Sequence, residues 1–312
     1  MQMDVIILGA FVADTTYRAA RQPSMGETIL GESFTLGPGG KGSNQAVAAG
    51  MAGASVGMIT KLGQDPFADM ALATWAKGGV TSLATHHSDA ATGAAYIFVD
   101  DKSGDNAIII CPGVAATLCP EDVDAQADTI ATAKVVMTQL EQPLDAAQRF
   151  LHLGKSSGAI SILNPAPAAE LSSEMIGLCD YITPNESEAE GITGIPVTSP
   201  ADAKFAAEAL LQMGAKAAII TLGENGCLFH DGTTPVFVPP LSAGPVVETT
   251  GAGDAFNGGL AAALAEGQAP RDAVLFATAT AAISVTRAGT APSMPERAEI
   301  DALVAKAPKT FG

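Results

Sequence analysis

Short apolar runs alternate with longer helix-compatible stretches along most of the chain. Such runs, typical of strands buried on both faces of a sheet, occur at 5–8, 55–61, 134–138, 159–163, 181–183 and 217–221. Helices are expected between and after them, at about 43–52, 66–77, 143–153, 170–178, 200–213, 253–266 and 271–286. This alternation predicts an α/β fold with a mostly parallel central sheet flanked by helices.

Two stretches, 10–36 and 92–110, interrupt the alternation. Neither contains a convincing helix, but β-prone segments occur at 28–34, 94–99 and 107–110. The turn at 100–105 separates the last two segments, as in a hairpin. We therefore expect a single domain over residues 1–312, with a small β-sheet lid formed by the two insertions.

Composition and charge narrow the class of protein. The 312 residues are 47% hydrophobic and 16% charged, which is sufficient for a substantial core. A formal net charge of −17 argues against nucleic acid or an anionic membrane as a partner, because both would be repelled. Residues 1–4 carry no basic segment of a signal peptide, and no apolar run reaches the roughly 18 residues of a membrane span, so a cytoplasmic protein is expected.

The first segment with candidate chemistry is Gly37-Pro38-Gly39-Gly40-Lys41-Gly42-Ser43-Asn44-Gln45, before an expected helix. Its glycines allow close approach to a ligand and positive φ. Lys41 supplies a cation, and Asn44 can donate hydrogen bonds to hydroxyls and accept them. The alternative is a flexible loop at a helix start. A Walker A loop is excluded, since Gly42 follows Lys41 and Thr35 stands where the first glycine is required.

The second segment is Thr249-Thr250-Gly251-Ala252-Gly253-Asp254, where a short strand turns through two glycines into a helix. Successive N–H groups at a helix N-terminus form an anion site. Asp254 would repel an anion that is merely bound, but it is suited to remove a proton from a hydroxyl during phosphate transfer. The alternative is a capping aspartate. A dinucleotide-binding fingerprint is disfavoured because Phe256 replaces its third glycine.

The third segment is Thr183-Pro184-Asn185-Glu186-Ser187-Glu188, after an expected strand. Asn185 and Glu188 are one helical turn apart and therefore share a face. An amide and a carboxylate suit Mg²⁺, which prefers oxygen ligands and keeps several waters. A helix N-terminus with acidic residues favoured by the dipole explains this segment equally well.

Taken together, the three segments resemble the ribokinase-like (phosphofructokinase-B type) carbohydrate kinases over nearly the full chain. Smaller segments at 139–141, 164–168, 221–226 and 285–293 resemble the ribokinase branch of that family. The resemblance implies a three-layer fold with a β-lid, which commonly pairs two subunits into a homodimer. It also implies an ATP-dependent kinase that phosphorylates the primary hydroxyl of a pentose, with D-ribose giving ribose 5-phosphate.

The resemblance assigns a role to each matching position. Asp254 would be the catalytic base, beside an anion hole formed by the N–H groups of Gly251, Ala252 and Gly253. The sugar would be held by Asp14, Gly40, Lys41, Gly42, Asn44, Glu141 and Asp254. ATP would contact Asn185, Thr221, Gly223, Gly226 and Gly253, with Glu188 acting on Mg²⁺ through water. A monovalent cation, K⁺ in this family, would lie near Glu248, Thr250, Ser284, Arg287, Gly289 and Ser293, in part through backbone carbonyls.

Two positions depart from the family pattern. Val12 stands where ribokinases typically carry asparagine, and a valine cannot hydrogen-bond a sugar hydroxyl. A deoxysugar or another sugar is therefore an open alternative to ribose, as is a nucleoside. Glu248 replaces the usual aspartate of the cation loop, which puts dependence on potassium in question. An alternative from another class is a sugar- or nucleotide-binding regulator without catalysis.

Overall fold

A computed structural model describes residues 3–308 and places a nine-stranded sheet at the centre. The strand order is β15-β14-β13-β12-β11-β10-β1-β4-β6. Neighbours from β13 to β6 are parallel, whereas β14 and β15 extend one edge antiparallel. The bounds are β1 Val5–Leu8, β4 Val56–Ile59, β6 Val80–Ser82, β10 Val135–Thr138, β11 Ile160–Leu163, β12 Tyr181–Ile182, β13 Ala217–Thr221, β14 Cys227–His230 and β15 Val236–Val238.

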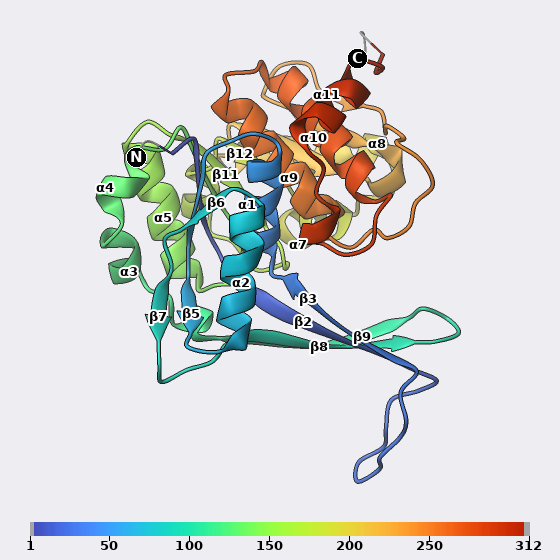
Figure 1. Cartoon of the computed structure of the whole chain (residues 1–312). Helices are drawn as coiled ribbons and strands as arrows, with labels where there is room; N and C mark the ends of the chain where they lie inside the picture. Colours follow the sequence, from blue (N-terminus) through green and yellow to red (C-terminus); the bar gives the residue numbers. More distant parts are fainter. Residues whose placement is uncertain (1–2, 309–312) are drawn as a thin grey trace.

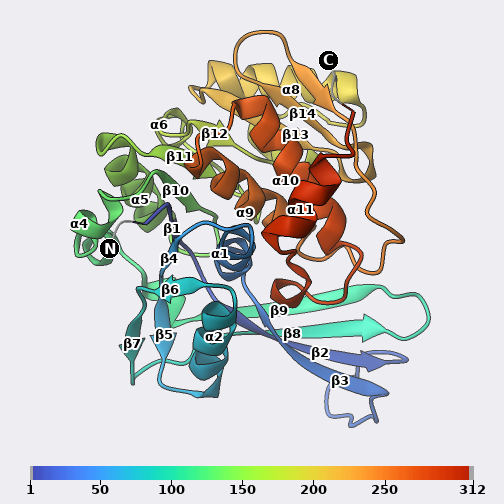
Figure 2. The ribbon, with the colours of Figure 1, turned by 45° about the horizontal axis from the view of Figure 1, so that its top comes forward.

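Helices cover both faces of the central sheet (Figures 1 and 2). One face carries α1 (Lys41–Met51), α2 (Pro66–Lys77), α9 (Ala252–Ala265), α10 (Pro270–Ser284) and α11 (Arg297–Val304). The other carries α3 (Pro120–Asp124), α4 (Ala127–Ile130), α5 (Leu144–Ser156), α6 (Ser173–Gly177), α7 (Glu186–Thr193) and α8 (Pro200–Gln212). Side chains of β1 alternate between these layers, since Val5 and Ile7 pack into one core and Ile6 and Leu8 into the other. Burial on both faces explains the continuous apolar runs.

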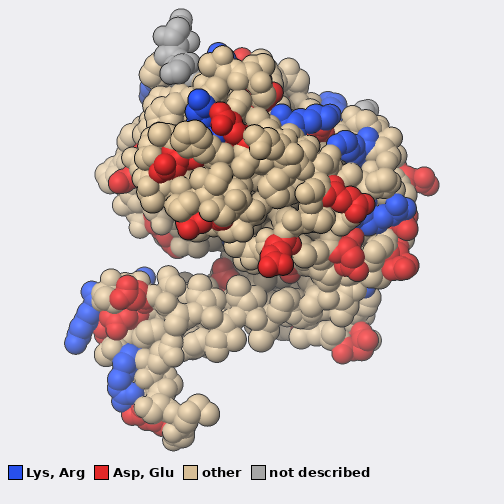
Figure 3. All heavy atoms as spheres, turned by 180° about the vertical axis from the view of Figure 1, so that it is seen from behind, with Lys and Arg blue, Asp and Glu red and all other residues tan. Residues whose placement is uncertain are grey.

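A second sheet projects from this body as an arm (Figures 1 and 2). Its order is β3-β2-β8-β9, with β2 Val12–Ala19, β3 Ser33–Gly39, β8 Thr92–Asp100 and β9 Asn106–Gly113. We call it the small sheet. Seen from behind, a groove separates the arm from the body (Figure 3). Because side chains alternate along a strand, Asp14 and Tyr17 of β2 lie on opposite faces of the small sheet.

The predicted fold class is confirmed as α/β with a large, mostly parallel sheet and a small separate sheet. The expected bounds 5–8, 66–77 and 217–221 agree with β1, α2 and β13. The apolar run 55–61 divides into β4 and the first strand of a separate pair, β5 (Lys61–Gly63) with β7 (Thr85–His87). The expected β-prone segment 28–34 starts too early, because β3 begins only at Ser33. Between residues 3 and 308, no helix is long and apolar enough to cross a membrane.

Helices α1 and α9 approach each other closely on their shared face of the sheet. A Cβ atom on Gly258 would lie 2.4 Å from the Cβ of Ala48 and 2.6 Å from the backbone oxygen of Gln45, so a larger residue would push the helices apart. The first turns of α1 and α9 consequently meet near the carboxyl ends of β1, β10 and β11. In open α/β sheets this edge is where ligands bind.

Candidate active site

The glycine-rich loop before α1 adopts a conformation that only glycine tolerates. Gly40 has φ of 85°, and a Cβ there would lie 2.6 Å from the backbone oxygen of Ala10 and 2.8 Å from the nitrogen of Val12. The carbonyl of Gly40 accepts the N–H of Asn44, which starts the helix. Gly42 lies against Gly9, where a Cβ would be 2.7 Å from the Gly9 Cα. Lys41, Asn44 and Gln45 are thereby fixed on the first turn of α1.

The loop before α9 ends in a left-handed glycine, Gly251, with φ of 82°. The N–H of Ala252 donates to the carbonyl of Thr249 at 3.1 Å, which closes the turn. Among residues 3–308, no backbone acceptor lies on the N–H groups of Gly251 and Gly253. These two amides at the positive end of a 14-residue helix are suited to an anion. The amide of Ala252, expected in the same role, is already occupied in this structure.

Asp254, in the first turn of α9, is buried, with 7% of its surface exposed. One carboxylate oxygen, Oδ2, accepts a hydrogen bond from Asn44 Nδ2 at 2.9 Å, and Oδ1 accepts one from Gln45 Nε2 at 3.0 Å. Burial raises the pKa of Asp254, while Lys41 and the two amide donors act against this increase. A buried carboxylate with a raised pKa is a stronger base than an exposed one.

Two further carboxylates lie on the arm side of Lys41. Asp14 of β2 packs against Gly39, where a Cβ would lie 2.2 Å from the aspartate Oδ2. Burial, with Asp254 nearby, raises the pKa of Asp14 to about 6. Glu141 accepts the backbone N–H of Lys41 at 2.7 Å, and burial raises its pKa to about 7 in spite of Lys41. Asp14, Glu141 and Asp254 therefore surround one lysine, an arrangement suited to binding several hydroxyl groups.

Asn185 and Glu188 form the N-terminal capping box of α7. Asn185 Oδ1 accepts the N–H of Glu188 at 2.9 Å, and Glu188 Oε2 accepts the N–H of Asn185 at 2.9 Å. The structure therefore contains the alternative described above for this segment, the capped N-terminus of a helix. Glu188 is 8% exposed, and burial raises its pKa. Its Oε1 takes no part in the capping box, so the cap leaves one carboxylate oxygen for a further ligand.

Thr221 ends β13 beside Asn185, with which it forms an isolated parallel bridge. The turn that follows, Gly223–Asn225, ends at Gly226 with φ of 88°. A Cβ on Gly226 would lie 2.2 Å from the carbonyl oxygen of Val238, so a side chain cannot be accommodated there. Gly223 has φ of 52°, and a Cβ there would meet no atom within 4 Å, which leaves open space beside the turn.

A cavity of about 180 Å³ brings residues of all three segments together. Its lining consists of Lys41, Asn164, Ala166, Thr183, Asn185, Glu188, Thr221, Gly251, Gly253, Asp254 and Asn257. Gly223 and Gly226 do not line it, and neither do Asp14, Asn44 and Glu141, which reach Asp254 or Lys41 through the contacts above. Of the residues singled out from the sequence, those that line this one cavity are Lys41, Asn185, Glu188, Thr221, Gly251, Gly253 and Asp254.

Four lining residues had no role in the sequence-based prediction: Asn164, Ala166, Thr183 and Asn257. Asn164 and Thr183 follow β11 and β12 directly, and polar residues after buried parallel strands are the signal that could have identified them. Thr183 Oγ1 donates to Asn257 Oδ1 at 2.7 Å, and Asn257 Nδ2 donates to the carbonyl of Gly253 at 2.8 Å. These bonds connect the end of β12 to the turn at Gly251–Gly253 and so stabilise it.

The residues expected around a monovalent cation lie in the loop before α9 and in the segment that runs from the end of α10 to Ser293. Glu248 Oε2 accepts the N–H of Gly289 at 2.8 Å and so joins the loops. The hydroxyls of Ser284 and Ser293, both buried, donate to the carbonyls of Ala281 and Thr290. The Arg287 side chain forms an ion pair with Glu299 of α11. Any cation ligand from Arg287 would therefore be its backbone carbonyl. Thr250 directly precedes the anion-binding turn.

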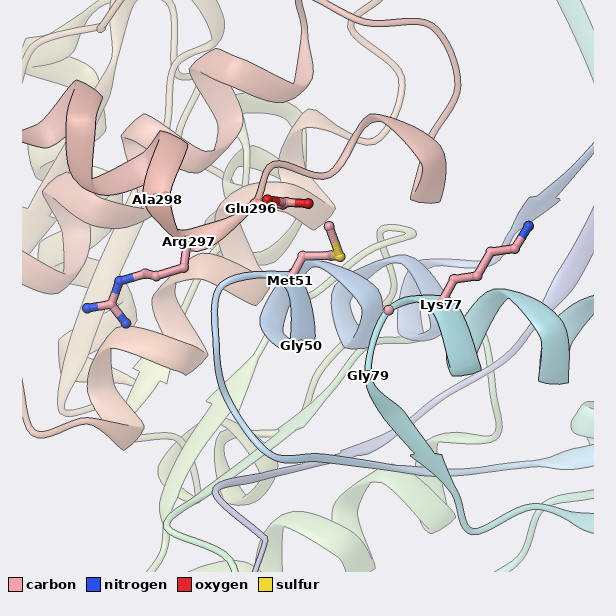
Figure 4. Close-up of a pocket in the computed structure, with 8 residues that line it drawn as sticks. Gly50, Met51, Lys77, Gly79, Glu296, Arg297 and Ala298 are labelled. Carbon is pink, nitrogen blue, oxygen red and sulfur yellow. The ribbon is translucent and has the colours of Figure 1, made fainter.

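A larger cavity, of about 390 Å³, lies where the ends of α1 and α2 meet the start of α11 (Figure 4). Arg297 extends away from Met51 in this view and pairs with Glu266 and Asp301. Lys77 points in the opposite direction, and Gly50 and Gly79 add only backbone. Polar groups do not converge here, so this cavity is not the candidate active site.

Comparison with known proteins gives a consistent result. The sequence model of the pfkB family carbohydrate kinases matches residues 3–297. A ribokinase of Haemophilus influenzae is 36% identical over 96% of this chain and 97% of its own length. A deoxyribokinase of Salmonella typhi is 36% identical over 94% and 96%. The structure of Arabidopsis thaliana ribokinase complexed with ribose and ATP superposes with a TM-score of 0.92 at 28% identity, covering 97% of this chain and 99% of that one.

Proposed function

The chain belongs to the pfkB family of carbohydrate kinases, phosphotransferases with an alcohol group as acceptor, and we propose that it transfers the γ-phosphate of ATP to the 5-hydroxyl of D-ribose. One observation carries the proposal. The buried carboxylate of Asp254 shares a cavity with the N–H groups of Gly251 and Gly253 and with Lys41. A base beside an anion site is the arrangement that phosphate transfer to a hydroxyl requires.

In the proposed reaction, Asp254 accepts the proton of the sugar hydroxyl while the oxygen of that hydroxyl bonds to the γ-phosphorus. The bond between that phosphorus and the bridging oxygen of ADP breaks, and ADP leaves. Negative charge on the transferring group is met by the N–H groups of Gly251 and Gly253 and by Lys41. These groups are fixed before substrate binds, so little reorganisation is needed in the transition state.

The nucleotide would lie along Asn185, Thr221 and the turn at Gly223–Asn225, beside the anion site. The sugar would lie towards the arm, among Asp14, Asn44 and Glu141. Glu188 fits Mg²⁺, because Oε1 is not used by the capping box and magnesium prefers oxygen ligands with several waters. When bound, Mg²⁺ would neutralise charge on the phosphate oxygens.

Movement of the small sheet over the sugar would exclude water from the site and so limit the hydrolysis of ATP.

Val12 supports a second candidate substrate, 2-deoxy-D-ribose. Val12 and Asp14 are two residues apart on β2 and therefore share a face of the small sheet. Val12 is buried beside Gly40 in the glycine loop. The apolar side chain of Val12 offers no hydrogen bond to a sugar hydroxyl. This favours a substrate that lacks the hydroxyl at this position. The 36% identity to a deoxyribokinase is consistent with this alternative.

We also propose a monovalent cation, K⁺ as the family resemblance implies, at the loops joined by Glu248 and Gly289. The loops border the anion site, since a Cβ on Gly251 would lie 3.3 Å from the Cα of Thr290. A cation there would stabilise the turn that presents the anion-binding amides. Glu248 supplies the negative charge of this region.

The small sheet supports a homodimer as the proposed assembly. Tyr17, Phe34, Leu36 and Ile109 are 42–63% exposed and lie, by register, on the face opposite Asp14. The rings of Tyr17 and Phe34 are 5.0 Å apart, so the patch is continuous. A second copy of the chain, presenting the same apolar face, would cover it and leave the Asp14 face free for substrate.

The first prediction concerns the base. Asp254→Asn should lower kcat at least a hundredfold while the Kd for ATP stays within a few-fold. The fold should tolerate the change, because the Asn44 amide can rotate and accept from the new asparagine. Asp272→Asn, at the same position of the first turn of α10 but exposed, is the matched control. Near-native turnover of Asp254→Asn would remove this residue from the mechanism.

The second prediction concerns the sugar. In a coupled ADP-release assay, D-ribose should give the highest kcat/KM among ribose, 2-deoxyribose, hexoses and nucleosides. Val12→Asn should raise the ratio of kcat/KM for ribose over deoxyribose about tenfold, because an added partner rewards the extra hydroxyl; Val12→Leu, close to asparagine in shape but apolar, should not. A hundredfold preference of the wild-type enzyme for another acceptor would contradict ribose. If none of the sugars tested gave ADP release, the remaining alternative would be a sugar- or nucleotide-binding regulator without catalysis.

The third prediction concerns the cation. Turnover in a potassium salt should exceed turnover in a tetramethylammonium salt of equal ionic strength several-fold. Glu248→Gln should reduce this difference, because it removes the charge beside the cation. Equal rates in the two salts would show that no monovalent cation acts here.

The fourth prediction concerns assembly. Sedimentation equilibrium should find a dimer for the wild-type protein and a monomer for Phe34→Glu, since a charge would be buried in the interface. Phe205→Glu is the control, because Phe205 on α8 is 56% exposed and Phe34 is 55% exposed. A wild-type monomer, or a dimer unaffected by Phe34→Glu, would argue against the small sheet as the interface.

A further inference from the structure

A row of buried amide side chains lies directly behind the proposed base. Gln45 Nε2 donates to Asp254 Oδ1 and to Asn164 Oδ1, both at 3.0 Å. Gln45 Oε1 accepts from Gln139 Nε2 at 2.5 Å. Gln45 and Gln139 are fully buried and Asn164 is 6% exposed. Three elements far apart in sequence, α1 and the ends of β10 and β11, thus meet at one glutamine.

The orientation of the Gln45 amide is determined by Asp254 and Asn164. Asn164 Nδ2 donates to the carbonyl of Thr183 at 3.0 Å, so Asn164 presents its oxygen to Gln45. Gln45 therefore turns its NH₂ group towards Asp254 and Asn164 and its own oxygen towards Gln139, whose Nε2 donates to it. A rotated Gln45 amide would place oxygen against oxygen at Asp254 and at Asn164.

Two glycines make room for the far end of this row. A Cβ on Gly9 would lie 2.4 Å from Gln139 Oε1, and one on Gly42 would lie 2.9 Å from the same atom. The glycine that ends β1 and a glycine of the first motif therefore leave space for Gln139. Within residues 3–308, Gln139 Oε1 has no hydrogen-bond partner, so Gln139 is retained in the interior with half of its amide unused.

The charged groups around Asp254 do not replace these amides. Lys41 of α1 attracts the carboxylate electrostatically, and Asp14 of β2, Glu141 after β10 and Glu188 of α7 repel it. In the described chain, the side-chain donors to Asp254 are the neutral amides of Asn44 and Gln45. A neutral donor orients a carboxylate while lowering its basicity less than an ion pair would.

We propose that Gln45, itself oriented by Asn164 and hydrogen-bonded to Gln139, is a positioning residue that holds the carboxylate of Asp254 towards the sugar hydroxyl. The inference rests on the proposed function, in which Asp254 is the base. Asn44 holds the other oxygen, so the two amides together fix the carboxylate plane. Gln45 acts through Asp254 and does not line the substrate cavity.

The test compares three Gln→Met variants, which keep the side-chain length and remove the amide. Gln45→Met should lower kcat about ten- to a hundredfold and leave KM for ribose and ATP within about twofold. The acid limb of the kcat profile should move to higher pH, because a hydrogen bond to the ionised carboxylate is lost. Gln139→Met should change the same quantities less, since it removes the donor to Gln45 Oε1 and leaves the bonds of Gln45 to Asp254 and Asn164 in place.

The control is Gln142→Met. Gln142 is also buried, but its Nε2 donates to Thr138 Oγ1 and to the backbone carbonyl of Gln139, with no bond to Asp254. Its pH profile should match that of the wild type. The double variant at 45 and 139 should be no slower than Gln45→Met alone, because both act through one amide.

A slower Gln45→Met enzyme with an unmoved pH profile, or a double variant with additive losses, would overturn the inference. If the thermal transition shows that Gln45→Met does not fold, Gln139→Met takes its place in the test. A pH profile of kcat for Gln139→Met that equals the wild-type profile then overturns the inference. Wild-type turnover in the same assay separates the two claims. Its absence contradicts the proposed function and this inference together, whereas normal wild-type turnover with unmoved variant profiles contradicts the inference alone.

Discussion

The structure of the candidate site depends on keeping one carboxylate, that of Asp254, away from water. A buried charge is costly unless it is hydrogen-bonded, by several kcal/mol even after relaxation. Both oxygens of Asp254 are therefore occupied by amides from the first turn of α1. Those amides can reach it only because α1 and α9 touch at Gly258. The close contact between α1 and α9 therefore serves this single requirement.

The same requirement explains how a chain with a net charge of −17 is suited to a polyphosphate. Phosphate would be met by the amides of Gly251 and Gly253 at the positive end of α9 and by Lys41, none of which needs a basic surface. Of three other acidic side chains in this region, Glu188 is buried and Asp14 and Glu141 are partly buried, and all three have raised pKa values. The overall charge therefore describes the exterior and carries no information on this interior.

The sequence predicts those parts of the molecule that local pattern determines. Continuous apolar runs identify the buried strands, and glycines before helices identify the loops at Gly40 and Gly251. Strands β14 and β15 and helix α11 were not predicted. Their hydrophobic patterns are short or mixed, so these elements are determined by packing and not by local sequence. The roles of Gln45, Gln139 and Asn164 were not predicted either, since their contacts join residues 94 to 209 positions apart. At Asn185 and Glu188, the two interpretations prove compatible, because the capping box uses only one oxygen of Glu188.

The titration of Asp254 itself would show whether this carboxylate is a base or a stabilised anion. Carbon-13 NMR of protein labelled at aspartate Cγ, with the resonance assigned by its absence in Asp254→Asn, would give the pKa of this group in the intact protein. We expect the pKa of Asp254 to lie above the ordinary 3.8 of aspartate, because burial outweighs Lys41 and the two amides. A value at or below 3.8 would contradict this expectation, since Asp254 would then be a stabilised anion and a poor base.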